Sequence, residues 1–89
     1  MKRVRLLISG RVQGVNYRSF SHHEALKRGL TGYARNLPVG TVEILLEGDG
    51  SEIEDFITWC HKGSPYARVE AVEATIEPYQ GEFQNFEIR

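Results

Sequence analysis

The stretch GRVQGVNYR, residues 10–18, combines glycines and arginines in a pattern that can bind an anion. It lies between an apolar run that predicts a strand and a segment that predicts a helix. Backbone N–H groups of such a loop can converge on a cluster of oxygens, and the helix N-terminus adds partial positive charge. Gly14 allows the backbone to approach a ligand closely, and the planar guanidinium of Arg18 matches phosphate geometry. Taken alone, the stretch also fits a simple turn followed by a solvated arginine.

Other side chains with catalytic or metal-binding chemistry fit ordinary structural roles better. His22 and His23 are adjacent on a predicted helix, so they diverge by about 100° and cannot easily share a ligand. Cys60 lies on an apolar helical stripe, where a buried and inert thiol is expected. His61, near the end of the same helix, is expected to contact the helix dipole favourably. The acidic stretch EGDGSE at 47–52 lacks the ligand spacing of an EF-hand loop. We therefore expect no metal site.

Periodicity and turn residues predict the elements that must position this loop. A strand leads into the loop, a helix follows it, and a hairpin of two strands comes next. A second helix and two further strands complete the chain. The predicted ranges are strand 4–9, helix 19–29, strands 30–37 and 40–48, helix 48–63, and strands 67–79 and 82–89.

The second helix has the clearer apolar stripe, formed at i, i+3, i+4, i+7 by Ile53, Phe56, Ile57 and Cys60. Its N-cap is either Asp49, paired with Glu52, or Ser51, paired with Glu54.

The first helix has only a weak stripe, and its start is less certain. The stripe runs through His22, Ala25, Leu26 and Gly29. Ser21 and Glu24 have capping-box spacing, so the helix begins at Ser21 or a turn earlier.

In the third strand, apolar residues alternate with Glu43 and Glu47, so one face is expected in the core and the other mostly in solvent. The two helices each bury a single stripe, and the strands need one covered face. These demands predict an α+β fold, a ferredoxin-like βαββαβ sandwich. We expect an antiparallel sheet with two helices on one face, a short fifth C-terminal strand, and a single domain over residues 1–89.

Composition narrows the function classes. The chain has 89 residues, 40% of them apolar and 26% charged, with a net charge of −1. This balance argues against nucleic acid as a partner, because such proteins usually carry a basic excess. No apolar run approaches the roughly 20 residues of a membrane span, and the N-terminal apolar run is too short for a signal peptide. The single cysteine, Cys60, cannot form an internal disulfide, so a cytoplasmic location is expected.

Several motifs together resemble one family. GRVQGVNYR closely resembles the first signature of the acylphosphatases, Gly-x-Val-Gln-Gly-Val-x-Phe-Arg, and GYARNLPVGTVEILLEG at 32–48 resembles their second. GSPYARVE at 63–70 and GEFQNFEIR at 81–89 are also similar to that family. Tyr17 stands where the signature usually has phenylalanine, so its hydroxyl needs a partner. Asn16 fills a variable position.

The resemblance implies an enzyme that hydrolyses acyl phosphates to a carboxylate and inorganic phosphate, without metal or cofactor. Arg18 would bind the phosphate, and Asn36 would orient the attacking water. The remaining ligands would be backbone N–H groups of Gln13, Gly14, Val15, Asn16, Tyr17 and Arg18. Inorganic phosphate would compete with the substrate, and the protein would act as a monomer with neither nucleic acid nor membrane as partner.

Two alternative functions are compatible with the predicted fold but do not involve acyl phosphate hydrolysis. The first is a non-catalytic domain that binds phosphate or another small ligand for regulation. The second is an RNA-recognition module, which shares the βαββαβ order but stacks bases on paired aromatic residues of its central strands. The apolar runs at 4–9 and 42–47 contain no aromatic residue, which disfavours that module.

Overall fold

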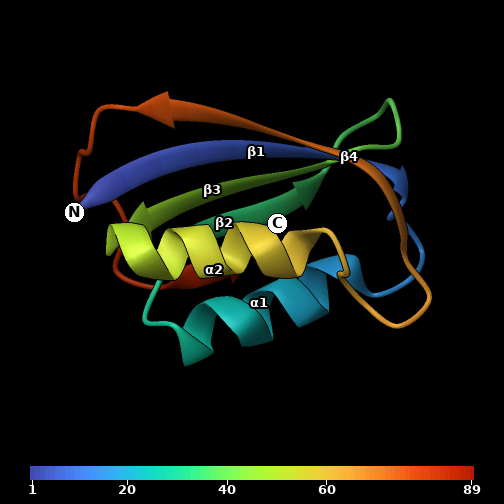
Figure 1. The fold of residues 1–89 in the computed structure, drawn as a ribbon, viewed down its shortest axis with the longest axis horizontal. Helices are drawn as coiled ribbons and strands as arrows, with labels where there is room; N and C mark the ends of the chain where they lie inside the picture. Colours follow the sequence, from blue (N-terminus) through green and yellow to red (C-terminus); the bar gives the residue numbers. More distant parts are fainter.

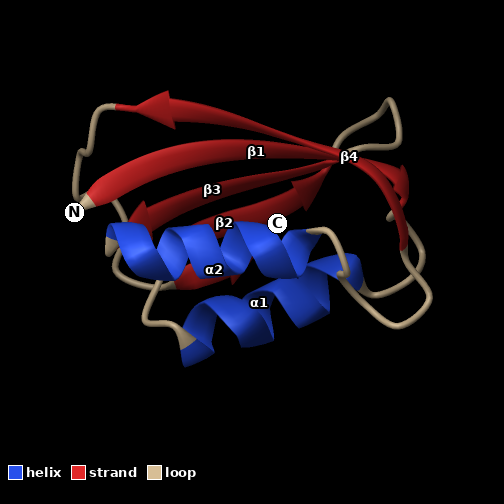
Figure 2. Ribbon diagram, in the orientation of Figure 1, coloured by secondary structure: helices blue, strands red, loops and turns tan.

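The computed structural model describes residues 1–89 and contains two helices and five strands. The strands form one sheet in the order β4-β1-β3-β2-β5, and both helices lie on one face of it (Figures 1 and 2). This arrangement confirms the predicted ferredoxin-like βαββαβ sandwich with a fifth strand. The elements are β1 (Lys2–Arg11), α1 (Tyr17–Lys27), β2 (Thr31–Asn36), β3 (Val42–Gly48), α2 (Gly50–Cys60), β4 (Arg68–Glu77) and β5 (Phe86–Ile88).

The sheet is mixed rather than wholly antiparallel. β1 pairs antiparallel with β3 and β4, and β2 pairs antiparallel with β3, as expected. β5 instead runs parallel to β2, with Gly32 beside Phe86 and Ala34 beside Ile88. β4 finishes at the end of the sheet where β2 starts. The chain crosses the sheet at that end and enters β5 in the same direction as β2 (Figure 1).

The core lies between the helices and the sheet. α2 begins at Gly50, and Asp49 is its N-cap, because the Asp49 side chain accepts hydrogen bonds from the N–H groups of Ser51 and Glu52 at 2.9 and 3.4 Å. The stripe residues Ile53, Phe56 and Cys60 are buried against the sheet. Each helix has 11 residues, and neither is long and apolar enough to cross a membrane.

The first helix differs from its prediction at both its start and its buried face. α1 begins at Tyr17, and the hydroxyl of Ser21 donates to the Tyr17 carbonyl at 2.7 Å instead of capping a helix end. The buried residues are Tyr17, Ser21 and Ala25, while Leu26 is 56% exposed. Of the predicted stripe, Ala25 is buried as expected, but Leu26 and Gly29 are exposed. The large Tyr17 side chain, one turn before Ser21, sets which face of the helix packs inward.

The sheet face away from the helices is not open to solvent at β3, contrary to the sequence-based expectation. Glu47 is only 2% exposed, because the segment 78–85 crosses this face on its way from β4 to β5. Its carboxylate accepts hydrogen bonds from the N–H groups of Gln80, Gly81 and Glu82 at 2.9, 3.2 and 2.9 Å. Arg3 also donates to it, at 3.1 Å. Glu47 therefore fastens the crossing segment to the sheet.

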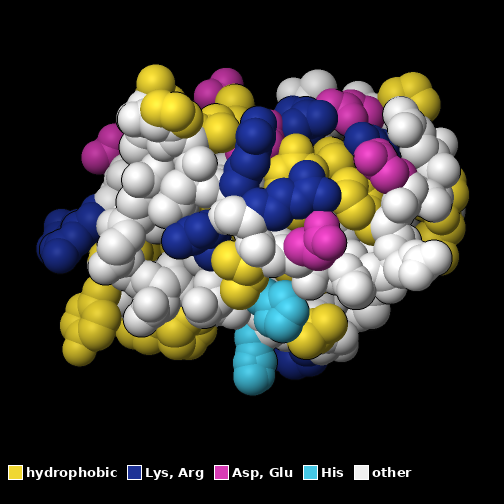
Figure 3. Space-filling view, turned by 180° about the vertical axis from the view of Figure 1, so that it is seen from behind, with side chains coloured by type: hydrophobic (Ala, Val, Ile, Leu, Met, Phe, Trp, Pro, Cys, Tyr) yellow, Lys and Arg dark blue, Asp and Glu magenta, His cyan; other side chains and the backbone are white.

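Glu43 is also buried on this face. It accepts from Arg5 at 2.8 Å, from Tyr33 at 2.9 Å and from Arg35 at 2.6 Å. Cationic and acidic side chains are accordingly interspersed over this side of the molecule (Figure 3). Buried carboxylates are tolerated here because each is paired and hydrogen-bonded.

These contacts predict a stability that falls in acid. Burial alone would raise the pKa of Glu47, but hydrogen bonds from the crossing segment and Arg3 lower it below the ordinary value of 4.5. The pKa of Glu43 is lowered in the same way by Arg35, Tyr33 and Arg5. The unfolded chain therefore binds more protons than the folded chain below about pH 5, and the free energy of unfolding falls as the pH drops further.

The variant that tests this acid dependence is Glu47→Gln, which removes the negative charge and places amide hydrogens against N–H donors. We expect it to lose about 2 kcal/mol of stability at neutral pH and to show a weaker acid dependence than the wild type. Urea unfolding at pH 7 and pH 4 measures both effects, with the exposed Glu54→Gln as control. Equal wild-type stability at the two pH values would contradict this assignment.

Candidate functional site

The loop between β1 and α1 presents backbone donors that have no partner in the protein. Gly14 and Asn16 adopt left-handed backbone conformations, with φ of 75° and 65°, which glycine and asparagine tolerate best. The N–H groups of Gln13, Gly14, Val15 and Asn16 donate no hydrogen bond within the protein. No side chain caps the N-terminus of α1, so its first N–H groups are also free of a cap. Such a run of unpaired donors is suited to an anion.

The side chain of Gln13 holds this loop in place. Its Nε2 donates to the carbonyls of Leu37 and Thr41 at 2.8 and 2.9 Å. These carbonyls belong to the connection between β2 and β3, so the loop is fastened beside the end of β2. Sequence reasoning considered only the N–H group of Gln13 and missed this role, for which the sequence offers no separate signal.

Tyr17 anchors the first turn of α1. Its ring is 1% exposed and lies 5.7 Å from the Trp59 ring. Its hydroxyl, absent from the usual phenylalanine of the signature, donates to the Cys60 carbonyl at 2.7 Å. Gly63, with φ of 67°, lies against the same ring, and a Cβ there would collide with it. The hydroxyl thus has a partner, and the start of α1 is joined to the end of α2.

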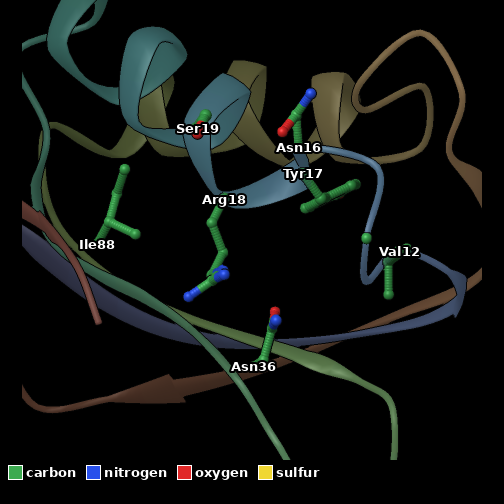
Figure 4. Close-up of a pocket in the computed structure, with 8 residues that line it drawn as sticks. Val12, Asn16, Tyr17, Arg18, Ser19, Asn36 and Ile88 are labelled. Atoms are coloured by element: carbon green, nitrogen blue, oxygen red, sulfur yellow. The ribbon is translucent and has the colours of Figure 1, made fainter.

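Arg18 and Asn36 meet in one small cavity of about 110 Å³. Arg18 reaches in from α1 and Asn36 from the end of β2, so the guanidinium and the amide point toward one another (Figure 4). Arg18 Nη1 donates to a main-chain oxygen of Arg89 at 2.7 Å, and no Asp or Glu side chain forms an ion pair with Arg18. The other N–H donors of its guanidinium therefore remain available to a ligand.

Most of the predicted site residues line this cavity, and three others do so as well. From the predicted set, Gly14, Asn16, Tyr17, Arg18 and Asn36 are part of its wall, whereas the side chains of Gln13 and Val15 are not. The other lining residues are Val12, Ser19 and Ile88. None of these three was predicted from the sequence as a wall residue, although Val12 lies in the GRVQGVNYR stretch. Ser19 directly follows Arg18 on the helix, which was an available signal, while Ile88 depends on the parallel pairing of β5.

Cys60 lies outside the cavity and is fully buried. Burial raises the pKa of its thiol to about 12, so the thiolate is negligible near neutral pH. No group of three or more His, Cys, Asp or Glu side chains is arranged to hold a metal ion.

We expect Cys60→Ala to lower stability by about 1 kcal/mol, and to leave the acyl phosphate hydrolysis implied by the sequence motifs intact in the folded protein, because only a packed sulfur is lost. The carbonyl of residue 60 remains, so Tyr17 keeps its hydrogen-bond partner. Thermal unfolding and steady-state kinetics on the same sample measure both. Loss of turnover in a fully folded variant would instead make the thiol catalytic.

Comparison with known proteins assigns the chain to a family. The family described as Acylphosphatase matches residues 4–88, nearly the whole chain. The chain belongs to the acylphosphatase family. An acylphosphatase of Rubrobacter xylanophilus is 47% identical over 88 residues, covering 99% of this chain and 80% of that protein. An acylphosphatase of Aeropyrum pernix is 50% identical over 88 residues, covering 98% and 87%.

The fold agrees with the family assignment. The crystal structure of acylphosphatase from Bacillus subtilis superposes with a TM-score of 0.97 at 36% identity, covering 100% of this chain and 99% of that one. As an acylphosphatase, the protein is an enzyme that hydrolyses acyl phosphates to a carboxylate and inorganic phosphate.

Proposed function

We propose that the cavity beside Arg18 is where this reaction occurs, with the phosphate of the substrate held by Arg18 and by backbone N–H groups of residues 13–18. The observation that carries the proposal is the coincidence, at one cavity, of unpaired N–H donors and an arginine that pairs with no Asp or Glu side chain. Unpaired donors and a guanidinium both favour an anion, and the tetrahedral oxygens of a phosphate suit convergent donors.

The bond of Arg18 to the main-chain oxygen of Arg89 supports this role. A guanidinium has five N–H donors, and this oxygen occupies only one of the two on Nη1. The bond limits the motion of a long side chain, so less conformational entropy is lost when a phosphate binds. In our proposal the remaining donors contact two phosphate oxygens side by side.

Asn36 completes the proposed mechanism by orienting a water molecule toward phosphorus. As that water attacks, its oxygen bonds to phosphorus and the bond from phosphorus to the acyl oxygen breaks. The leaving group is a carboxylate, a weak base, so no general acid is needed. Phosphoryl transfer passes through a loose transition state, so positioning and charge stabilisation supply most of the catalysis. A phosphate oxygen accepts the proton that the water loses.

The test of this proposal is the hydrolysis of benzoyl phosphate by the purified protein with and without inorganic phosphate. We expect turnover, competitive inhibition by phosphate, and a higher melting temperature at saturating phosphate, since phosphate binds only the folded loop. A chelator should leave the rate unchanged. Phosphate binding without hydrolysis would indicate the non-catalytic domain instead, and absence of any effect of millimolar phosphate would refute the anion site.

We also propose that the enzyme acts as a monomer in a reducing compartment such as the cytoplasm. Every residue proposed for the site comes from one chain, and the single thiol of Cys60 is buried and unpaired. Light scattering coupled to size-exclusion chromatography tests the first point, and cell fractionation tests the second.

A further inference from the structure

One wall of the cavity has a chemical character that phosphate binding does not require. Ile88 lines the cavity with 47% of its surface exposed. The other apolar lining residues, Val12 and Tyr17, are each 1% exposed and offer almost no surface. Apart from Gly14, the rest of the wall is polar or charged. A single exposed isoleucine is normal on a protein surface, so its position beside the reacting group is the informative feature.

Ile88 is held close to the guanidinium of Arg18. β5 pairs in parallel with β2 so that Ile88 lies beside Ala34, and the N–H of Arg89 donates to the Ala34 carbonyl at 2.9 Å. Asn36 follows Ala34 by two residues on the same strand, so it shares that face of the sheet. A main-chain oxygen of Arg89 in turn accepts a hydrogen bond from Arg18. Figure 4 shows Ile88 on the side of Arg18 away from Val12.

The size of the cavity determines what Ile88 can contact. A cavity of about 110 Å³ that already holds the Arg18 and Asn36 head groups in its wall has room for the phosphate, but not for a large acyl group as well. The acyl group must therefore extend past the rim. Ile88 is the exposed apolar surface at that rim, and apolar groups gain free energy by covering such a surface.

We infer that Ile88 contacts the acyl group and gives the enzyme a preference for acyl phosphates whose acyl group is apolar. This inference rests on the function proposed above. Ile88 offers no hydrogen-bond partner to a free carboxylate in the acyl group, and the donors of Arg18 are engaged by the phosphate, which disfavours such a substrate. A small acetyl group would cover little of the Ile88 surface and would gain little from this contact.

The effect of Ile88 on substrate preference can be estimated from hydrophobic pockets in other enzymes. A small difference in apolar contact there changes the ratio of kcat/KM between two substrates by about 10- to 200-fold. Because Ile88 covers only one side of the acyl group, we expect the lower end of that range. Ile88→Ala should reduce the ratio of kcat/KM for benzoyl phosphate to that for acetyl phosphate by about tenfold.

The experiment compares benzoyl, acetyl and succinyl phosphate in the wild type, Ile88→Ala, Ile88→Lys and a control. Succinyl phosphate carries an extra carboxylate, so Ile88→Lys should shift the preference from benzoyl toward succinyl phosphate. Ile76→Ala is the matched control, because Ile76 is 80% exposed on β4 and does not line this cavity. Its ratios should equal those of the wild type. Circular dichroism and the dissociation constant of inorganic phosphate verify the fold and the phosphate site in each variant.

The outcomes separate this inference from the proposed function. Hydrolysis by all variants with unchanged ratios in both Ile88→Ala and Ile88→Lys would overturn the role of Ile88 and leave the proposed function standing. A wild type that hydrolyses none of the three substrates would overturn both. A ratio that shifts equally in Ile76→Ala would also refute the inference, since the effect would not then belong to the cavity.

Discussion

Replacing Arg18 with alanine is expected to lower kcat/KM for an acyl phosphate by about 10³-fold and to abolish inhibition by inorganic phosphate. In the proposed mechanism the guanidinium contacts the phosphate in both the ground state and the transition state, so substrate binding and turnover decline together. The loss is large because the side chain supplies the positive charge at the cavity and a planar pair of donors. Phosphate dissociation constants and steady-state kinetics measure the two effects.

Arg18→Lys tests whether charge alone suffices. We expect little rescue, because an ammonium is a point charge and cannot present two parallel N–H donors or keep the bond to Arg89 in the same geometry. Arg68→Ala is the matched control, since Arg68 is exposed on β4, forms no ion pair and does not line the cavity. A folded Arg18→Ala protein with normal phosphate affinity would refute the assignment.

Asn36→Ala should have a different signature. If the amide orients only the attacking water, phosphate affinity stays nearly intact while kcat falls by roughly 10²-fold or more, the size expected for one preorganised hydrogen-bonding group. Asn36→Asp should not restore turnover, because its carboxylate would repel the anionic substrate. The split between kcat and phosphate affinity is the informative quantity, because a merely structural role would impair both.

The control for the two Asn36 variants is Asn85→Ala. Asn85 is exposed and lies in the segment between β4 and β5. It should match the wild type in kcat and in phosphate affinity. A folded Asn36→Ala enzyme with normal kcat would remove Asn36 from the mechanism and leave the phosphate site unaffected.

The order of apolar and polar residues along the chain was sufficient to predict those features of the fold that depend on short-range contacts. The apolar stripe of α2 is a short-range feature, and three of its four predicted residues, Ile53, Phe56 and Cys60, are buried. The sequence left the cap open between two residues, and the structure has Asp49. The burial of Glu43 and Glu47 was not predictable in this way. The alternation of residue types in β3 correctly separates its two faces. It cannot reveal that a segment more than thirty residues away covers the polar face, where the N–H groups of Gln80 and Gly81 donate to Glu47.

The candidate site shows the same division. The types and spacing of residues 13–18 predicted a loop of backbone donors, and the family signature pointed to Asn36. The arrangement around them depends on contacts between distant residues, such as Gln13 with Leu37 and Tyr17 with Cys60. Ile88 joins the cavity only because β5 enters the sheet parallel to β2, and the sequence does not specify the direction of such a crossing.

The central claim is that the loop after β1 and the start of α1 bind the phosphate. Titration of ¹⁵N-labelled protein with inorganic phosphate, followed by amide NMR shifts, tests it most directly. We predict large saturable shifts confined to the N–H groups of residues 13–19 and to the Asn36 side chain, and their loss in Arg18→Ala. Saturable shifts centred on another part of the chain, with residues 13–19 unmoved, would contradict the account.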